Sequence, residues 1–262
     1  MNKAMQTMDK ADLMTKAAKM RKRLGCDESF PIDIFPLAAN IPGLTIVFYP
    51  MGDNLSGMCV KIEDGLSLIA INSTMSNGRQ RFSMAHEFYH LLYDKSDRSI
   101  CWRDFSMSEN KPLEREADFF ATQFLMPQTE LETKVEELSA SHTDRKLTIE
   151  DVIKIEQHFN MSHKATMLRL KGMQCIPNGR FEEYYYETGI RDIAMRLGFP
   201  PGLYLPMHEK YRYCSYGNYI KMAFDIHNKG RISDGKFEEL LLSAFRPDLV
   251  YGEDTEESNV ID

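Results

Sequence analysis

The chain has 262 residues, of which 43% are hydrophobic and 27% are charged, as in an ordinary globular protein. Its 32 basic and 39 acidic residues give a net charge of −7, opposite to the basic balance of a dedicated nucleic-acid-binding protein. The five cysteines form no CxxC pair, which argues against a disulfide framework and a cysteine-ligated zinc finger. No stretch approaches the roughly 18 apolar residues of a membrane-spanning helix. We therefore expect a cytoplasmic protein with free thiols.

The first third of the chain predicts a helix followed by a small sheet. Apolar residues recur at helical spacing over residues 3–24, and Gly25 is a natural stop. Three runs rich in apolar residues predict strands at Leu44–Tyr49, Met58–Glu63 and Leu66–Ile71. The dipeptide Asp64-Gly65 between the last two runs is a hairpin signal.

Two helices follow the predicted sheet. The first begins after Ser76-Asn77-Gly78 and runs to about Tyr93, and the second spans Pro112–Leu125 before Met126-Pro127 ends it. The segment between them, residues 95–111, is polar and predicts irregular structure.

The second half of the chain predicts mainly helices. A polar linker or short helix at 128–144 precedes a helix-turn-helix pattern at 148–172, and two further helices are expected at 216–228 and 233–244. The order of elements is typical of an α+β fold, with a small antiparallel sheet packed on two helices and followed by a helical C-terminal half. We predict a first domain at 1–130, a helix-turn-helix-like segment at 131–176, and a mainly helical domain with an acidic tail at 177–262.

The first predicted helix contains the pattern HExxH. Positions i and i+4 lie on one helix face, so His86 and His90 can bind one metal ion together. Glu87 lies beside such a metal without binding it and can take a proton from an attacking water molecule. Zinc is the metal that this donor set and chemistry favour, because it lowers the pKa of water to about 7. The pattern therefore predicts a metallopeptidase site.

A catalytic zinc needs a third protein ligand, and the second predicted helix offers one. Glu114 and Asp118 are four residues apart and share a face with small alanines, so Glu114 can complete the ligand set. Asp118 can accept a hydrogen bond from a ligand histidine, or it is a plain surface acid. Glu116 lies about 200° around the helix from Glu114 and is an alternative ligand. Asp94, one turn beyond His90, is another alternative.

The chain resembles the ImmA/IrrE metallopeptidases, bacterial and phage proteins with a gluzincin-like core. Besides the HExxH helix, the resemblance rests over roughly residues 10–130 on Pro31-Ile32-Asp33-Ile34, Ala70-Ile71-Asn72, Arg79-Gln80-Arg81-Phe82, the run Glu114–Ala121 and Leu125-Met126-Pro127. It implies zinc bound by His86, His90 and Glu114, with Glu87 as the catalytic glutamate. It also implies cleavage of a helix-turn-helix repressor, which relieves repression of stress or mobile-element genes. Tyr89, where many members carry glycine, is expected to face away from the metal.

Three further expectations concern the partners and the function of the protein. Residues 145–171 hold six basic and three acidic side chains, which allows DNA binding by a recognition helix, but a helical pair packed on the peptidase is the favoured interpretation. A strand edge, Met58–Ile62 or Leu66–Ile71, is expected to hold the substrate extended. The main rival function is a zinc-containing antirepressor that sequesters its partner without cutting it.

Overall fold

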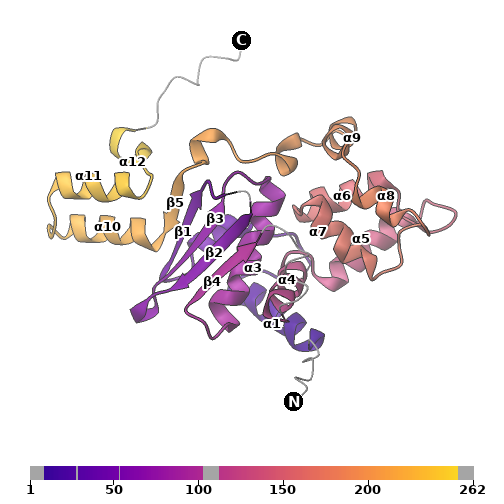
Figure 1. The fold of residues 1–262 in the computed structure, drawn as a ribbon, viewed down its shortest axis with the longest axis horizontal. Helices are drawn as coiled ribbons and strands as arrows, with labels where there is room; N and C mark the ends of the chain where they lie inside the picture. Colours follow the sequence, from indigo (N-terminus) through magenta and orange to yellow (C-terminus); the bar gives the residue numbers. More distant parts are fainter. Residues whose placement is uncertain (1–8, 28, 53, 103–111, 253–262) are drawn as a thin grey trace, which may run out of the picture.

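The structure is a computed structural model that describes residues 9–27, 29–52, 54–102 and 112–252. Figure 1 shows a sheet at the centre, helices packed on it, a helical cluster on one side and a helical hairpin on the other. The α+β class predicted from the sequence is confirmed. None of the helices formed by the described residues combines the length and the apolar character that crossing a bilayer requires.

The described residues form a sheet in the order β4-β2-β3-β1-β5. The predicted hairpin is present, since β2 (Leu55–Lys61) and β3 (Ser67–Asn72) pair antiparallel across Asp64 and Gly65, whose φ values are 59° and 76°. However, β3 also pairs in parallel with β1 (Leu44–Tyr49). The sheet is therefore mixed rather than antiparallel throughout. The physical reason is that β3 is an apolar, almost wholly buried run, which is stable in the middle of a sheet rather than at its edge.

Both edge strands form in segments where the sequence predicted no strand. The segment at 95–111, expected to be irregular, contains β4 (Arg98–Trp102), which pairs antiparallel with β2. At the opposite edge, β5 (Cys214–Gly217) pairs antiparallel with β1 and so joins the C-terminal part of the chain to the sheet. The expectation that β2 or β3 offers a free edge to substrate is therefore wrong, because β4 and β1 already occupy those edges.

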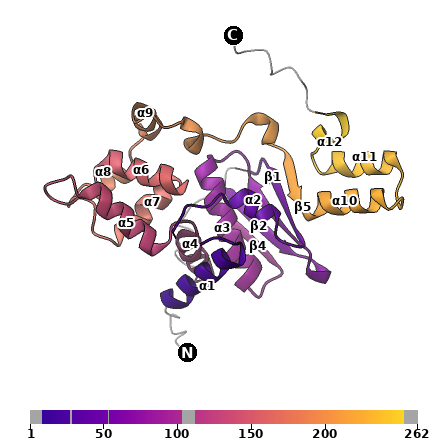
Figure 2. The ribbon, with the colours of Figure 1, turned by 180° about the vertical axis from the view of Figure 1, so that it is seen from behind.

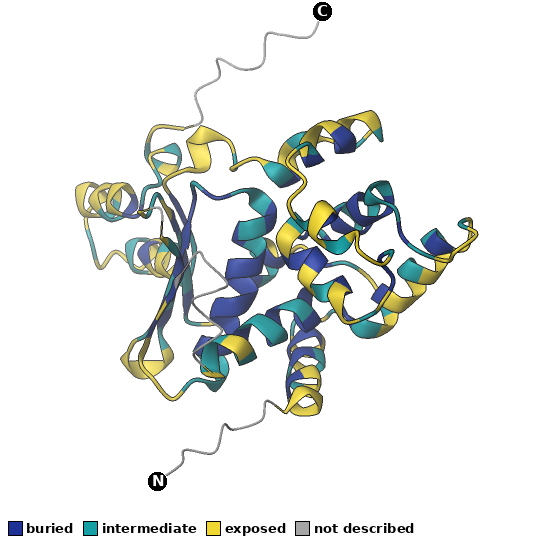
Figure 3. Cartoon of the chain, turned by 45° about the vertical axis from the view of Figure 1, so that its right-hand side comes forward, coloured by how far each residue is buried: buried dark blue, intermediate teal, exposed yellow. Residues whose placement is uncertain are grey.

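Both predicted motif helices are present beside the sheet. The first, α3 (Asn77–Tyr93), lies against the sheet, and α4 (Pro112–Leu125) lies against α3 and begins and ends at the predicted residues. The helix predicted at 3–24 forms over Lys10–Arg23 (α1) and packs on α4, whereas residues 3–8 lie outside the described part. Figure 3 shows the buried residues concentrated where the sheet and these helices meet. The buried phenylalanines of the sheet, α3 and α4 in this core are Phe48, Phe82, Phe88, Phe120 and Phe124.

The rest of the chain surrounds the sheet and its helices. One helix beside the sheet, α2 (Ile34–Ala39), packs on α3, β1 and β5. The helical cluster comprises α5 (Gln128–Ser139), α6 (Ile149–Phe159), α7 (His163–Lys171), α8 (Phe181–Tyr185) and α9 (Ile190–Arg196). The hairpin of α10 (Asn218–Asn228) and α11 (Asp234–Ser243), followed by α12 (Asp248–Tyr251), lies at the other end of the molecule (Figure 2). The predicted helices of the C-terminal half are thus present.

Candidate metal centre

The two histidines of the HExxH pattern lie side by side on α3. His86 is 6% exposed and His90 is 1% exposed, because this face of α3 is covered by α4 and by the sheet. Their Nε2 atoms are 3.1 Å apart. The i, i+4 spacing therefore brings the two imidazoles together as predicted.

Glu114 on α4 faces both histidines. Its Oε2 atom lies 3.3 Å from Nε2 of His86, and its Oε1 atom lies 3.7 Å from Nε2 of His90. Donors at the vertices of a tetrahedron, about 2.0–2.3 Å from a central zinc, lie about 3.3–3.7 Å from one another. The three side chains thus have the spacing of one ligand set, although they come from two helices.

The outer nitrogens of both rings contact carboxylates. Nδ1 of His86 lies 2.8 Å from Oδ1 of Asp118, and Nδ1 of His90 lies 3.2 Å from Oδ2 of Asp94. Because ionised carboxylates only accept hydrogen bonds, each Nδ1 is the protonated nitrogen of its ring. The Nε2 lone pairs then face each other and Glu114, an arrangement that repels itself unless a proton or a cation lies among them. The site therefore fits a cation on its own geometry.

Among the side chains alone, the neighbouring charges favour a proton on His86 over one on His90. Burial lowers the pKa of His90, and the neighbouring His86 lowers it further. Burial also disfavours a charge on His86, but contacts with Cys101, Asp118 and Glu114 outweigh burial and raise the pKa of that ring. Burial raises the pKa of Glu114, yet the two histidines outweigh this effect and hold it below its usual value. Glu114 is therefore an anionic donor at neutral pH.

Two acids that the sequence left as alternative ligands have other partners. Glu116 accepts a hydrogen bond from the hydroxyl of Tyr89 on the side of α4 away from the cluster. Asp94 ends α3 and supports His90 through Nδ1 rather than facing the metal position. The sequence spacing allows this contact, because Asp94 lies four residues after His90 and such residues share a helix face. Asp118, four residues after Glu114, instead contacts His86 on the other helix.

Glu87 is fully buried next to this cluster. Burial raises the pKa of Glu87 to about 7, although the charge on His86 and the Cys101 thiol oppose the rise. Neither carboxylate oxygen has a hydrogen-bond partner in good geometry among the described residues. Gly57 of β2 makes room for it, because a Cβ atom at that position would lie 2.9 Å from Oε1 of Glu87. The site thus holds a fully buried carboxyl group whose raised pKa suits it to exchange a proton near neutral pH.

Cys101 of β4 is a fourth member of the cluster, which the sequence did not predict. The donor atoms of His86, His90, Cys101 and Glu114 all lie within 4.8 Å of one another. No local motif marks this cysteine, because it lies in the polar segment at 95–111 and reaches the site only through the pairing of β4 with β2.

Asp118→Ala is expected to weaken metal binding about 10–100-fold, because residues that orient a metal-bound histidine contribute this much to affinity. The ring of His86 would lose the carboxylate that fixes its orientation and its protonated nitrogen. Titration of the purified protein with a metal-chelator competition assay measures the change. Arg115→Ala is the matched control, because Arg115 is exposed on the same helix. An unchanged dissociation constant for Asp118→Ala would contradict this role.

The chain is similar to a peptidase family and to a solved structure. The model of a peptidase family described as the IrrE N-terminal-like domain matches residues 39–171, just over half of the chain. A solved Mycobacterium tuberculosis transcriptional regulator aligns over 65% of this chain at 16% identity with a TM-score of 0.43, and this chain spans 49% of that structure. No curated protein matches the chain. Because the family model covers the HExxH helix, the Glu114 helix and most of the sheet, the chain belongs to the ImmA/IrrE family of peptidases with the IrrE N-terminal-like domain.

Proposed function

We propose that this protein is a zinc-dependent endopeptidase that cuts a helix-turn-helix transcriptional repressor and so relieves repression of stress or mobile-element genes. The observation that carries the proposal is Glu87, a buried carboxyl group beside a cluster of metal donors, whose oxygens have no hydrogen-bond partner in good geometry among the described residues. A metal that only stabilises a fold has no need of such a group. The resemblance to repressor-cleaving relatives supports the choice of substrate class.

His86, His90 and Glu114 are the residues that would hold the metal. Two imidazole nitrogens and one carboxylate are a common donor set of catalytic zinc. Bound there, zinc would supply a Lewis acid that polarises a peptide carbonyl and makes water more acidic. Asp118 and Asp94 hold the two rings with their Nε2 atoms turned inward, so the histidines need no rearrangement to bind.

Glu87 performs the proton transfers in this proposal. Its carboxylate accepts a proton from the attacking water and later donates that proton to the leaving amine. A group that alternates between these roles works best when its pKa is close to the working pH. The burial that raises the pKa of Glu87 to about 7 serves that purpose.

The contacts of the helix-turn-helix-like pair α6–α7 argue against DNA binding by this chain and so favour a protein partner. Arg169, on the second helix, donates to the side chains of Gln123 and Gln128 and so packs inward. Lys171 lies over the ring of Phe181. These cations have partners within the protein, so the pair is proposed as a segment packed on the peptidase domain.

The domain division at 1–130, 131–176 and 177–262 is kept as a proposal, although β5 of the last part completes the sheet of the first. The cytoplasmic location is likewise kept as a proposal.

The proposed function is tested by treating lysate of the native host with the wild-type protein and with Glu87→Gln, and by mapping new protein N-termini. Loss of a general acid–base group is expected to slow cleavage about 10²–10⁴-fold, so a new terminus appears with the wild type and not with the variant. Metal content, measured in both proteins, controls for loss of the site. Equal cleavage by a metal-loaded Glu87→Gln protein would refute the role of Glu87.

A second function, a metal-containing antirepressor that binds its partner without cutting it, is favoured by the presence of Cys101 in the cluster. Four protein donors are typical of closed, structural zinc sites. The same lysate experiment separates the two functions. Capture of a repressor by both proteins, without any new terminus from either, would support the antirepressor.

A further inference from the structure

We propose that the thiolate of Cys101 is a fourth metal ligand, and that it holds the peptidase in a closed, latent form. This inference rests on the proposed function, because it concerns the same metal centre. It starts from the fact that four donors converge, not three: the Sγ atom of Cys101 joins the two Nε2 atoms and the Glu114 carboxylate within 4.8 Å.

The sheet fixes the position of Cys101. In the ladder between β2 and β4, Cys101 lies opposite Gly57, with a register shift between Leu55 and Gly57. Such an irregularity re-aims side chains next to active sites. Ser56, inside the irregularity, donates a hydrogen bond from its hydroxyl to the Cys101 carbonyl at 3.2 Å. The backbone of Cys101 is therefore held, and the glycine opposite leaves its side chain room.

The two faces of β4 differ in environment. Cys101 and Ser99 are buried, with 2% and 9% of their surface exposed, whereas Ile100 between them is 51% exposed. Alternate residues of a strand point to opposite faces, so Cys101 and Ser99 point to the side of the sheet that α3 covers. The Ser99 hydroxyl lies 3.3 Å from Sγ of Cys101. Figure 1 shows β4 in the sheet beside β2, on the side where α3 and α4 lie.

A thiolate in this position has a direct chemical consequence. A catalytic zinc site has three protein ligands and keeps its fourth position for water or substrate, whereas a site with four protein ligands is closed. When Cys101 binds, its Sγ–H proton passes to solvent and a sulfur–metal bond forms. When Cys101 leaves, that bond breaks and the sulfur takes a proton back. No oxidant or reductant is required.

The position of β4 couples this ligand to substrate binding. β4 occupies the outer edge of β2, and Gly57 of β2 lies next to Glu87. An extended peptide can add to that edge only where its backbone groups are free. Detachment of the five-residue β4 would therefore free both a strand edge on which an extended peptide can pair and the fourth metal position.

The inference is tested by replacing the metal of the full-length protein with Co²⁺ and recording its absorption spectrum. A thiolate ligand produces an intense sulfur-to-cobalt charge-transfer band, which histidine and carboxylate ligands do not. We expect this band in the wild type, its loss in Cys101→Ala, and its retention in Cys59→Ala. Cys59 is the matched control, because it is a buried cysteine of the neighbouring strand β2 and is not among the clustered donors.

The outcomes separate this inference from the proposed function. A wild-type protein that binds Co²⁺ without the charge-transfer band, or a band that persists in Cys101→Ala, would overturn the inference and leave the peptidase proposal intact. Failure of the wild type to bind Co²⁺ at all would overturn both. If Cys101 holds the enzyme in a latent form, Cys101→Ala must generate new protein N-termini in the lysate faster than the wild type does. Equal rates would show that the thiolate does not restrain the enzyme.

Should Cys101→Ala fold poorly, Cys101→Ser provides the second variant, because serine preserves the size of the side chain while it removes the sulfur. The same spectrum is recorded, and a lost charge-transfer band with retained cobalt absorption supports the ligand.

Discussion

Glu114→Ala is expected to raise the dissociation constant for the metal by at least about 100-fold, whereas Glu116→Ala leaves it unchanged. Loss of a residue that only orients a ligand costs about 10–100-fold in affinity, and loss of a ligand exceeds that. Glu114 is the acid of α4 whose oxygens lie 3.3 Å and 3.7 Å from the two histidine nitrogens. Glu116 is the matched control, because it lies two residues away and pairs with Tyr89 instead.

Thermal unfolding with and without added Zn²⁺ measures this difference independently of activity. A ligand that binds only the folded state stabilises it by about 2.7 kcal/mol at a concentration of 100 times its dissociation constant. We expect this stabilisation in the wild type and in Glu116→Ala, and its loss in Glu114→Ala. If Glu116→Ala lost the response and Glu114→Ala kept it, the ligand would be the other glutamate. Equal responses from all three proteins would mean that α4 supplies no ligand.

Arg21→Met is expected to lower the free energy of unfolding by about 3–5 kcal/mol, because it leaves three carbonyl acceptors without their donor at a cost of about 1–3 kcal/mol for each one that is buried. Arg21 is 1% exposed. Its guanidinium donates from Nε to the Asp27 carbonyl and from Nη1 to the Phe124 carbonyl, both at 2.7 Å, and from Nη2 to the Phe30 carbonyl. Methionine fills much of the volume but leaves these carbonyls without their donor.

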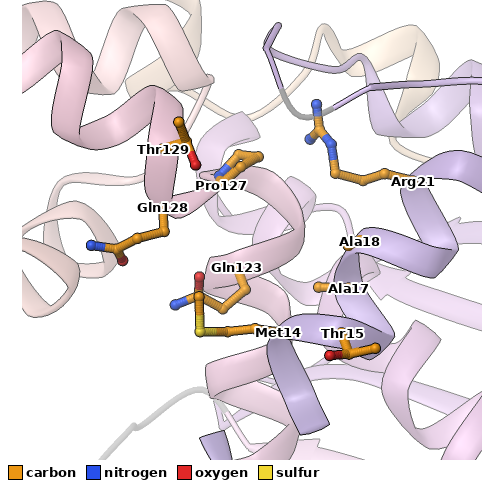
Figure 4. A pocket seen from close by; sticks show the side chains of 9 residues that line it. All are labelled: Met14, Thr15, Ala17, Ala18, Arg21, Gln123, Pro127, Gln128 and Thr129. Carbon is orange, nitrogen blue, oxygen red and sulfur yellow. The ribbon is translucent and has the colours of Figure 1, made fainter. Parts of the chain in front are cut away.

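Arg21 is connected to the metal centre through its hydrogen bond to the carbonyl of Phe124. Phe124 lies in the last turn of α4, where carbonyl groups have no partner within the helix. Arg21 therefore anchors the C-terminal end of the helix that carries Glu114 and Asp118. Figure 4 shows Arg21 among the residues of α1 that line a pocket, opposite Gln123 and the start of α5.

Urea-induced unfolding monitored by circular dichroism measures the effect of Arg21→Met. Arg23→Met is the matched control, since Arg23 lies in the same turn of α1 and is exposed, and we expect it to change stability by less than about 0.5 kcal/mol. Arg21→Lys is also expected to destabilise, because a single ammonium group cannot reproduce the planar fork of donors. A loss below about 1 kcal/mol for Arg21→Met would show that water replaces the guanidinium at these carbonyls.

Local periodicity was enough to predict the motif helices and the residues that share a helix face. The HExxH spacing requires a helix to bring His86 and His90 together, and the structure has α3 there with the two Nε2 atoms 3.1 Å apart. Glu114 and Glu116 lie about 200° apart around α4, and accordingly Glu114 faces the histidines whereas Glu116 contacts Tyr89. Both inferences depend on 3.6 residues per turn, a property that no distant part of the chain has to supply.

Which distant segments meet at the site depends on long-range strand pairing. β4 has five residues in a polar segment and becomes a strand because β2 offers its backbone groups for pairing. Its register with Gly57 brings Cys101 to the histidines, and a shift by one residue would turn the thiol to the opposite face. In the same way β3 lies parallel to β1, and β5 arrives from the C-terminal half. These pairings are long-range hydrogen bonds between backbones, and backbone groups carry no residue-specific pattern that a sequence can reveal.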